Sequence, residues 1–168
     1  MSGPWLVDGA SAPSVVNVDP AREFEDFYRR EVEWARRLAF VLVADAEAAN
    51  DIAHDGFARL QRRYPRLRNP RAYLRVTIVN LCRRHSRSEA RRRGATDALG
   101  CSAVVSAPSL ELLDLIDRLP YRQRAVLVLR YFEDLSEADI AESLGCRPGT
   151  VKSLAARALD QLRKELIK

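Results

Sequence analysis

Residues 134–157 read DLSEADIAESLGCRPGTVKSLAAR, and this stretch decides the fold. Ser136 with an acidic residue three positions later predicts a capped helix start, and Leu144-Gly145 predicts a helix end, because glycine is favoured directly after a helix. A turn follows, and a second helix is expected over 148–166. Apolar residues let the two helices pack across the tight turn, which predicts a helix-turn-helix. These residues are Leu135, Ile140, Ala141, Leu144, Val151, Ala155, Ala158, Leu159 and Leu162.

The second helix of this pair begins with small and basic side chains. A helix N-terminus offers free N–H groups and a positive dipole end to a phosphate. Short side chains there let the helix enter a major groove, where Arg and Lys can donate to guanine. An ordinary helical hairpin is the alternative. The residues expected on the exposed face are Arg147, Thr150, Lys152, Ser153 and Arg157.

The rest of the chain predicts further helices and no strand. Asp19 and Asn69 each precede a proline, which is the pattern of an N-cap before the first helical residue. The expected helices cover residues 20–43, 45–63, 70–93, 110–119 and 120–133. The helix at 45–63 has one apolar and one polar face. The apolar face holds Ala49, Ile52, Ala53, Gly56, Phe57 and Leu60, and the polar face holds Asp51, His54, Asp55 and Arg62.

Two stretches have no helical period. Residues 1–18 contain scattered glycine, proline and serine and predict a disordered tail, and residues 94–108 predict a flexible linker. They divide the chain into two small all-α domains, at 19–93 and 109–168. Each is small for an independent core, so docking between the domains would help to stabilise them.

The positive charge is concentrated in one segment. The whole chain has a net charge of +5, whereas residues 61–93 alone hold twelve arginines and one glutamate, a net charge of +11. That density suits a polyanion such as nucleic acid. A solvated Arg-rich helix is the alternative interpretation.

Several classes of protein are disfavoured. Three widely spaced cysteines (Cys82, Cys101 and Cys146) make no disulfide framework, and no secretory signal or membrane-length apolar run is visible. We therefore expect a cytoplasmic protein without membrane insertion. Cys82 and His85 could form half a zinc site, but a closed site needs four ligands, so we expect no metal and no cofactor. The motifs of phosphate-binding loops, HExxH proteases and GxSxG hydrolases are missing, so we expect no enzyme.

Several runs resemble one family. LPYRQRAVLVLRYFEDLS at 119–136, DIAESLG at 139–145 and GTVKS at 149–153 resemble conserved region four of the extracytoplasmic-function sigma factors, a subfamily of the sigma-70 factors of RNA polymerase. ANDIAHDGF at 49–57, NPRAYL at 69–74 and VNL at 79–81 resemble region two. The resemblance covers residues 22–93 and 110–166 and is of the actinobacterial sigma-E-like type.

The resemblance implies an alternative sigma factor that directs RNA polymerase core to promoter DNA and helps to melt the minus-ten element. Asp51, His54 and Asp55 of region two would bind the clamp helices of the polymerase β′ subunit. The residues implied at the minus-ten element are Arg66, Arg68, Tyr73, Asn80, Arg83 and Arg84. Those implied at the minus-thirty-five element are Arg147, Thr150, Lys152, Ser153 and Arg157. Region four would also meet the β flap, and an anti-sigma factor is a further expected partner, because the family usually has one.

Some positions depart from the family pattern or have a second explanation. His54 stands where glutamine is usual, and Tyr73 replaces the commoner tryptophan, although core packing explains an aromatic ring there equally well. Leu154-Ala155-Ala156 stands where the usual recognition helix carries Arg or Gln, then Leu, then Ser. This loss of polar groups from the reading face predicts weaker or more apolar contact with the minus-thirty-five element. Asn80 has a structural alternative, because its amide can cap or bridge helices.

Two other functions stay open at this point. An autonomous helix-turn-helix regulator would explain residues 109–168 but leaves the Arg-rich helix and the acidic face unused. A small adaptor or zinc module would have no role on DNA. Binding to core polymerase and salt-sensitive binding of the holoenzyme to promoter DNA separate these alternatives.

Overall fold

The computed structural model describes residues 19–93, the first half of the protein, and residues 110–167, the second half. The predicted tail at 1–18, the linker at 94–108 and the expected helix cap Ser109 lie outside the described residues. Within the two described ranges every regular element is a helix. The predicted all-α class is therefore confirmed.

The first half is a bundle of three long helices. They are α1 (Pro20–Val43), α2 (Ala46–Gln61) and α3 (Pro70–Arg93), with a short 3₁₀ turn, η1 (Tyr64–Arg66), before α3. Side-chain oxygens cap the helix starts as predicted: Asp19 accepts from the Ala21 amide at 3.1 Å, and Asn69 accepts from the Ala72 amide at 3.0 Å. The helix expected over 45–63 is shorter at both ends, because Asp45 is its N-cap and the chain turns after Gln61.

The predicted apolar face of α2 is buried against its neighbours. All six of its residues are buried: Ala49, Ile52, Ala53, Gly56, Phe57 and Leu60. Gly56 marks the closest approach to α3. A methyl group added there would lie 3.1 Å from Leu74 Cδ1 and 3.3 Å from Ile78 Cγ1. A larger side chain at this position would have to displace α3.

The second half contains the predicted helix-turn-helix. Its elements are α4 (Leu110–Asp117), α5 (Tyr121–Leu127), η2 (Val128–Phe132), α6 (Glu137–Leu144) and α7 (Pro148–Leu166). Ser136 caps α6 by accepting from the Asp139 amide at 3.2 Å, and Gly145 ends that helix with a φ of 60°. A left-handed backbone costs glycine little, so this glycine sets the tight turn.

The expected helix over 120–133 is present at 121–132, but its second part is not α-helical. α5 begins at Tyr121 and passes at Val128 into a π-helical turn, η2, in which the Glu133 amide donates to the Val128 carbonyl at 3.2 Å. Asp134 follows with a φ of 51°. Such turns hold an extra residue in the helix, and a run of apolar residues does not predict them.

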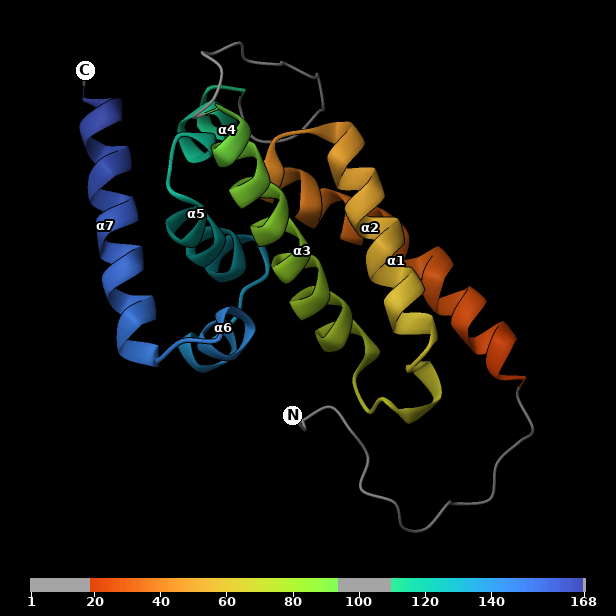
Figure 1. Cartoon of the computed structure of the whole chain (residues 1–168). Helices are drawn as coiled ribbons and strands as arrows, with labels where there is room; N and C mark the ends of the chain where they lie inside the picture. The colour runs from red at the N-terminus through yellow and green to blue at the C-terminus, as the bar shows by residue number, and fades with distance from the viewer. Residues whose placement is uncertain (1–18, 94–109, 168) are drawn as a thin grey trace.

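The two halves pack against each other. Figure 1 shows α3 in the middle, with α1 and α2 on one side and α5, α6 and α7 on the other. α3 contacts both α5 and α6, and α1 contacts α4 and α5. One cluster of buried side chains runs through both halves, from Phe27 to Ala155. The docking expected between two small domains is thus present.

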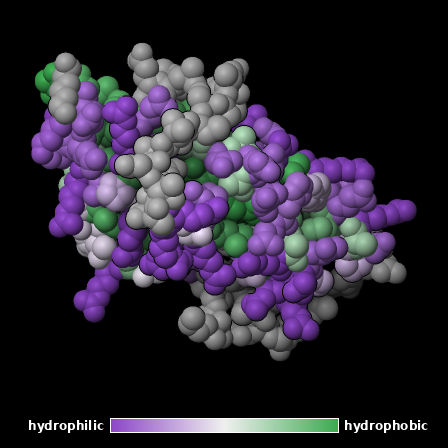
Figure 2. All heavy atoms as spheres, turned by 45° about the horizontal axis from the view of Figure 1, so that its top comes forward, coloured by the Kyte–Doolittle hydropathy of each residue, from purple (hydrophilic) through white to green (hydrophobic). Residues whose placement is uncertain are grey.

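An apolar groove remains open beside this contact. Its walls come from α1, α2, α4, α5, η2 and α7, and its volume is about 640 Å³. Its large exposed side chains are Leu112, Tyr131, Phe132 and Leu159. Leu159 is 41% exposed, so it is not the core residue that the sequence predicted. Figure 2 shows a face on which apolar side chains emerge among hydrophilic ones.

The contact of α2 with α3 gives a stability prediction. Gly56→Leu should lower the free energy of unfolding by about 1–3 kcal/mol, because the new side chain overpacks the space already filled by Leu74 and Ile78. Gly149→Ala is the matched control, since nothing lies within 4 Å of a methyl group there. Urea titration followed by circular dichroism measures both. Equal midpoints for Gly56→Leu and the unchanged chain would contradict the tight packing.

Candidate nucleic-acid interfaces

The first candidate surface is the start of α7. Arg147, Lys152, Ser153 and Arg157 are exposed, and Thr150 is half-buried. These residues occupy the first three turns, and the opposite face is anchored by buried side chains that include Val151. The structure therefore brings all five predicted residues to one end of α7. The backbone there is partly satisfied, because Pro148 has no N–H and the Thr150 amide donates to the Arg147 carbonyl at 2.9 Å.

Two side chains on this surface, Lys152 and Ser153, make contacts with nearby residues. The Ser153 hydroxyl donates to the Thr150 carbonyl at 3.0 Å, and Lys152 Nζ lies 3.6 Å from a carboxylate oxygen of Glu137. Glu137 also lies 3.5 Å from Arg130. These ion pairs are exposed enough to exchange for phosphate contacts at little cost.

The run Leu154-Ala155-Ala156 on α7 differs in exposure from residue to residue. Ala155 is buried, and Leu154 is half-buried and packed against the core. Ala156 alone of the three residues is exposed. Ala155 is therefore one of the packing residues that the sequence predicted, whereas the effect of Leu154 and Ala156 on reading of DNA stays a prediction.

The second candidate surface lies on α3. Asn80, Arg83 and Arg84 lie within one turn and a half, with Arg84 exposed and the other two half-buried. The Asn80 side-chain oxygen accepts a hydrogen bond from Arg83 Nη2 at 2.8 Å. The amide N–H₂ group of Asn80 and the remaining donors of Arg83 are left for other partners.

The other predicted minus-ten residues lie towards the start of α3. Arg66 and Arg68 are exposed just before the helix, and Tyr73 is half-buried in its first turn, with the Arg63 guanidinium 6.0 Å from its ring centre. At 1.5 Å per residue, Arg84 is about 21 Å along the helix from Pro70. The six residues therefore form a strip along α3 and not one compact cluster.

The third candidate surface is the polar face of α2. Asp51, His54 and Asp55 are exposed and line a shallow depression together with Ile52 and Ala58. Asp55 lies 3.2 Å from Arg59 one turn on, in an exposed pair that contributes little stability. The structure thus presents two carboxylates and an imidazole on one accessible patch.

Metal binding finds no support in the described part of the chain. No group of three or more histidine, cysteine or acidic side chains there could hold an ion. Cys82 of the considered half-site is fully buried, whereas His85 is half-buried. Cys101 lies outside the described residues.

The sequence did not predict the polar contacts between the two halves. Trp34, Tyr121, Arg124 and Glu133 all bond across this boundary. Arg124 is a buried arginine whose pKa is lowered by burial, against the opposing effect of Asp117. Tyr121 and Arg124 stand inside the motif that gave the family resemblance, but no local pattern reveals what they contact.

Each half of the chain matches a known family of protein regions. The family model described as sigma-70 region 2 matches residues 27–92, and that described as sigma-70, region 4 matches residues 109–162. The chain is 33% identical over 153 residues to the RNA polymerase sigma-E factor of Streptomyces coelicolor, covering 86% of each chain. It is 28% identical to the RNA polymerase sigma factor SigV of Bacillus subtilis, again over 86% of each.

A solved structure has the same fold. The sigma factor RpoE of Bartonella quintana, crystallised with the anti-sigma factor NepR, superposes with a TM-score of 0.70 at 21% identity. The match covers 86% of this chain and 97% of that one.

Proposed function

Because this chain belongs to the sigma-70 family of RNA polymerase sigma factors, in the extracytoplasmic-function subfamily, we propose a division of labour among its three candidate surfaces. The chain is an alternative sigma factor that directs RNA polymerase core to promoter DNA. The observation that carries the proposal is the pairing of an Arg-rich α3 in the region-two match with an exposed α7 in the region-four match.

Region two, residues 19–93, recognises and helps to melt the minus-ten element. The strip along α3 supplies arginines for phosphates and one amide for a base edge. A melted strand with a flipped base needs both kinds of contact, because its backbone must be held while the base is read. Its residues are Arg66, Arg68, Tyr73, Asn80, Arg83 and Arg84.

Region four, residues 109–168, reads the minus-thirty-five element and meets the β flap. The exposed start of α7 has the short and basic side chains that suit a major groove. Leu154 is half-buried and Ala156 is exposed at this end of the helix, so we expect weaker or more apolar reading than is usual in the family. Its residues are Arg147, Thr150, Lys152, Ser153 and Arg157.

The acidic patch on α2 binds the β′ clamp helices of the polymerase. Asp51, His54 and Asp55 are accessible, and their helix is fixed from behind by its buried face. Charged side chains at such a patch steer association and select the partner. The chain needs no cofactor and is not itself an enzyme, because catalysis belongs to the polymerase core.

An anti-sigma factor is the further partner that we propose. RpoE of Bartonella quintana was solved with such a factor. The apolar groove beside α1 and α4 is a surface of the size and character that suits a protein partner. None of the helices within 19–93 and 110–167 combines the length and the apolar character that a bilayer span demands. We propose that the chain acts in the cytoplasm, where the polymerase is.

Run-off transcription tests the function itself. Purified core polymerase with this chain should give discrete transcripts from genomic DNA, with mapped starts that share upstream elements, whereas core alone should not. The isolated chain should bind duplex DNA weakly and with a steep salt dependence. Tight sequence-specific binding by the free chain, without promoter-directed transcription, would favour the autonomous regulator.

The acidic patch on α2 gives a binding prediction. Asp51→Ala with Asp55→Ala should weaken binding to core polymerase at least about tenfold, or ~1.4 kcal/mol, because two accessible carboxylates leave the contact surface. Glu25→Ala with Asp26→Ala is the matched control: it removes the same charge from an exposed part of α1, where Glu25 pairs with Arg29 one turn on, as Asp55 does with Arg59. A competition assay that gave equal affinities for the two double variants would refute the clamp assignment.

The bond between Asn80 and Arg83 gives a prediction about melting. Asn80→Ala should impair promoter opening and relax the minus-ten preference, with a loss of roughly 1–3 kcal/mol in base discrimination. Permanganate footprinting of the melted bubble measures this effect, with thermal melts of the free variants beside it.

A double-mutant cycle with Arg83→Ala separates the two roles of Asn80. If Asn80 reads a base, its loss should impair opening even when Arg83 is already absent. If the double variant opens promoters no worse than Arg83→Ala alone, Asn80 acts only by holding Arg83. A strong drop in melting temperature with normal opening would make Asn80 a structural residue.

A further inference from the structure

One carboxylate joins three elements beside the start of α7. Glu137 is the first residue of α6, and its two oxygens face different cations. Oε1 lies 3.5 Å from Nη1 of Arg130 in η2, and Oε2 lies 3.6 Å from Nζ of Lys152 in α7. Lys152 is one of the residues proposed above for the minus-thirty-five element. Glu137 therefore reaches the DNA-facing surface of α7 from the helix that precedes it.

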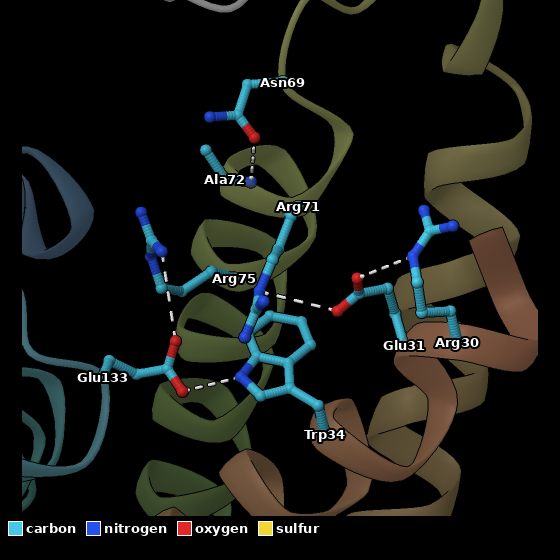
Figure 3. A network of polar contacts seen from close by, with 8 residues as sticks. All are labelled: Arg30, Glu31, Trp34, Asn69, Arg71, Ala72, Arg75 and Glu133. Atoms are coloured by element: carbon cyan, nitrogen blue, oxygen red, sulfur yellow. Dashed lines mark hydrogen bonds and ion pairs between the residues drawn. The ribbon is translucent and has the colours of Figure 1, made fainter.

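The carboxylates that hold helices of this protein together have different surroundings. Figure 3 shows the Glu133 carboxylate between the Trp34 indole and the Arg75 guanidinium. It accepts from Trp34 Nε1 at 2.6 Å, and its side chain is 5% exposed. A buried carboxylate needs such partners, because its desolvation would otherwise be costly. Glu133 thus stabilises the packing of the helices around it.

The Glu137 carboxylate is open to solvent by comparison. Its side chain is 32% exposed, and that of Lys152 is 69% exposed. Both of its contacts are longer than the roughly 2.7–2.9 Å of a charge-assisted hydrogen bond. Exposed ion pairs of this kind add little to stability. Glu137 therefore contributes little to the fold, and its main effect is on the charge of the surface at α7.

Lys152 differs in this respect from the other cations of that surface. Within residues 19–93 and 110–167, Arg147 and Arg157 make no ion pair, and the acid that pairs with Lys152 is Glu137. One acid therefore neutralises one of the three cations that region four offers to DNA at the start of α7.

We propose that Glu137 is a tethered counterion of region four, which competes with DNA phosphate for Lys152 and thereby lowers the affinity of the α7 surface for duplex DNA. Arg130 retains the carboxylate when Lys152 turns to a phosphate, because it already contacts the other oxygen. Glu137 is thus a positioning residue that acts through Lys152. The inference rests on the proposed role of α7 at the minus-thirty-five element.

The competition follows from the chemistry of the two anions. A carboxylate and a phosphodiester each carry a negative charge and offer oxygens to the same ammonium group. A phosphate oxygen about 2.8 Å from Lys152 Nζ would lie within about 6 Å of the Glu137 carboxylate in its present position. That separation is below the screening length of about 8 Å at physiological salt, so the two anions repel each other. DNA binding must either bear this repulsion or displace Glu137.

The charge of the surface also sets its dependence on salt. Each duplex phosphate that a cation neutralises contributes about 0.9 to the slope of log K against log salt, because counterions are released. Glu137 cancels one positive charge of this surface, so the slope should be smaller by about one than without it. The contact therefore limits the binding of region four to DNA of any sequence.

Glu137→Gln tests the proposal in the full-length chain bound to core polymerase. The amide keeps the shape of the side chain and removes its charge. Binding to a duplex promoter mapped by run-off transcription is measured by fluorescence anisotropy over a series of salt concentrations, at a temperature that keeps the promoter closed. The variant should bind about three- to tenfold more tightly at low salt, with a slope steeper by about one.

Glu142→Gln is the matched control. It makes the same charge change at an exposed position of α6 that has no ion pair in the described part of the chain. This variant should alter the affinity less than about twofold, because salt screens charges that do not contact the DNA-facing cations. Thermal melts of both variants should match that of the parent. Equal gains in affinity from the two variants would overturn the proposal, since the contact with Lys152 would then be irrelevant.

Lys152→Ala supplies a double-mutant cycle. Because Glu137 acts through Lys152, Glu137→Gln should lose most of its gain in this background. A full gain without Lys152 would overturn the proposal, as would a Glu137→Gln variant that binds no more tightly than the parent.

Failure of the proposed function has a different signature. A parent holoenzyme that directs no promoter-specific transcription would count against that function alone. The comparison of Glu137→Gln with Glu142→Gln would then be made on a duplex of mixed sequence, where the same gain is expected because phosphate contacts carry no base information. Equal affinities of the two variants for that duplex would overturn the tethered counterion.

Discussion

The packing of α3 on two sides is the constraint on which the rest of the structure depends. One stripe of this helix completes the region-two core with α1 and α2, and a second stripe with Arg75 and Val79 receives the second half. Each half has a small core, so burying this second stripe adds to the stability of both. The same packing sets where the polar surfaces of the protein are.

Two faces of α3 are covered, but polar surface remains exposed along the helix, including Arg84, Arg87 and Arg91. Of the residues proposed for the minus-ten element, Asn80 and Arg83 are only half-exposed. The recognition helix α7 is different, because one buried face is enough to anchor it and its start is open. The two proposed DNA-binding surfaces therefore differ in exposure: the predicted residues of α7 are mostly exposed, whereas Asn80 and Arg83 of α3 are half-buried.

Local signals predicted much of this architecture. Caps at Asp19, Asn69 and Ser136 and the left-handed Gly145 follow from the chemistry of a few adjacent residues, as does the buried face of α2. Contacts between distant segments could not be predicted in this way. The bonds of Tyr121 and Arg124, the π-helical turn before Glu133 and the partial burial of Leu154 all depend on which helices become neighbours. The apolar residues of α3 do not recur at the spacing of a single buried helix face, because two faces of this helix are buried. The resemblance to the family predicted the roles of the surfaces. It did not predict how the two halves pack against each other.

The distance between the two halves, in the free protein and on a promoter, tests the central claim most directly. Spin labels on Glu47→Cys in α2 and Arg163→Cys in α7, both exposed positions, report it by pulsed electron resonance. Cys101 and Cys146 would be changed to serine, and the buried Cys82 kept. The account predicts one short, narrow distance for the free chain, and an increase of several tens of Å in the promoter-bound holoenzyme, since the elements are about 85 Å apart. A broad, long distribution in the free chain, or an unchanged short distance in the promoter complex, would contradict it.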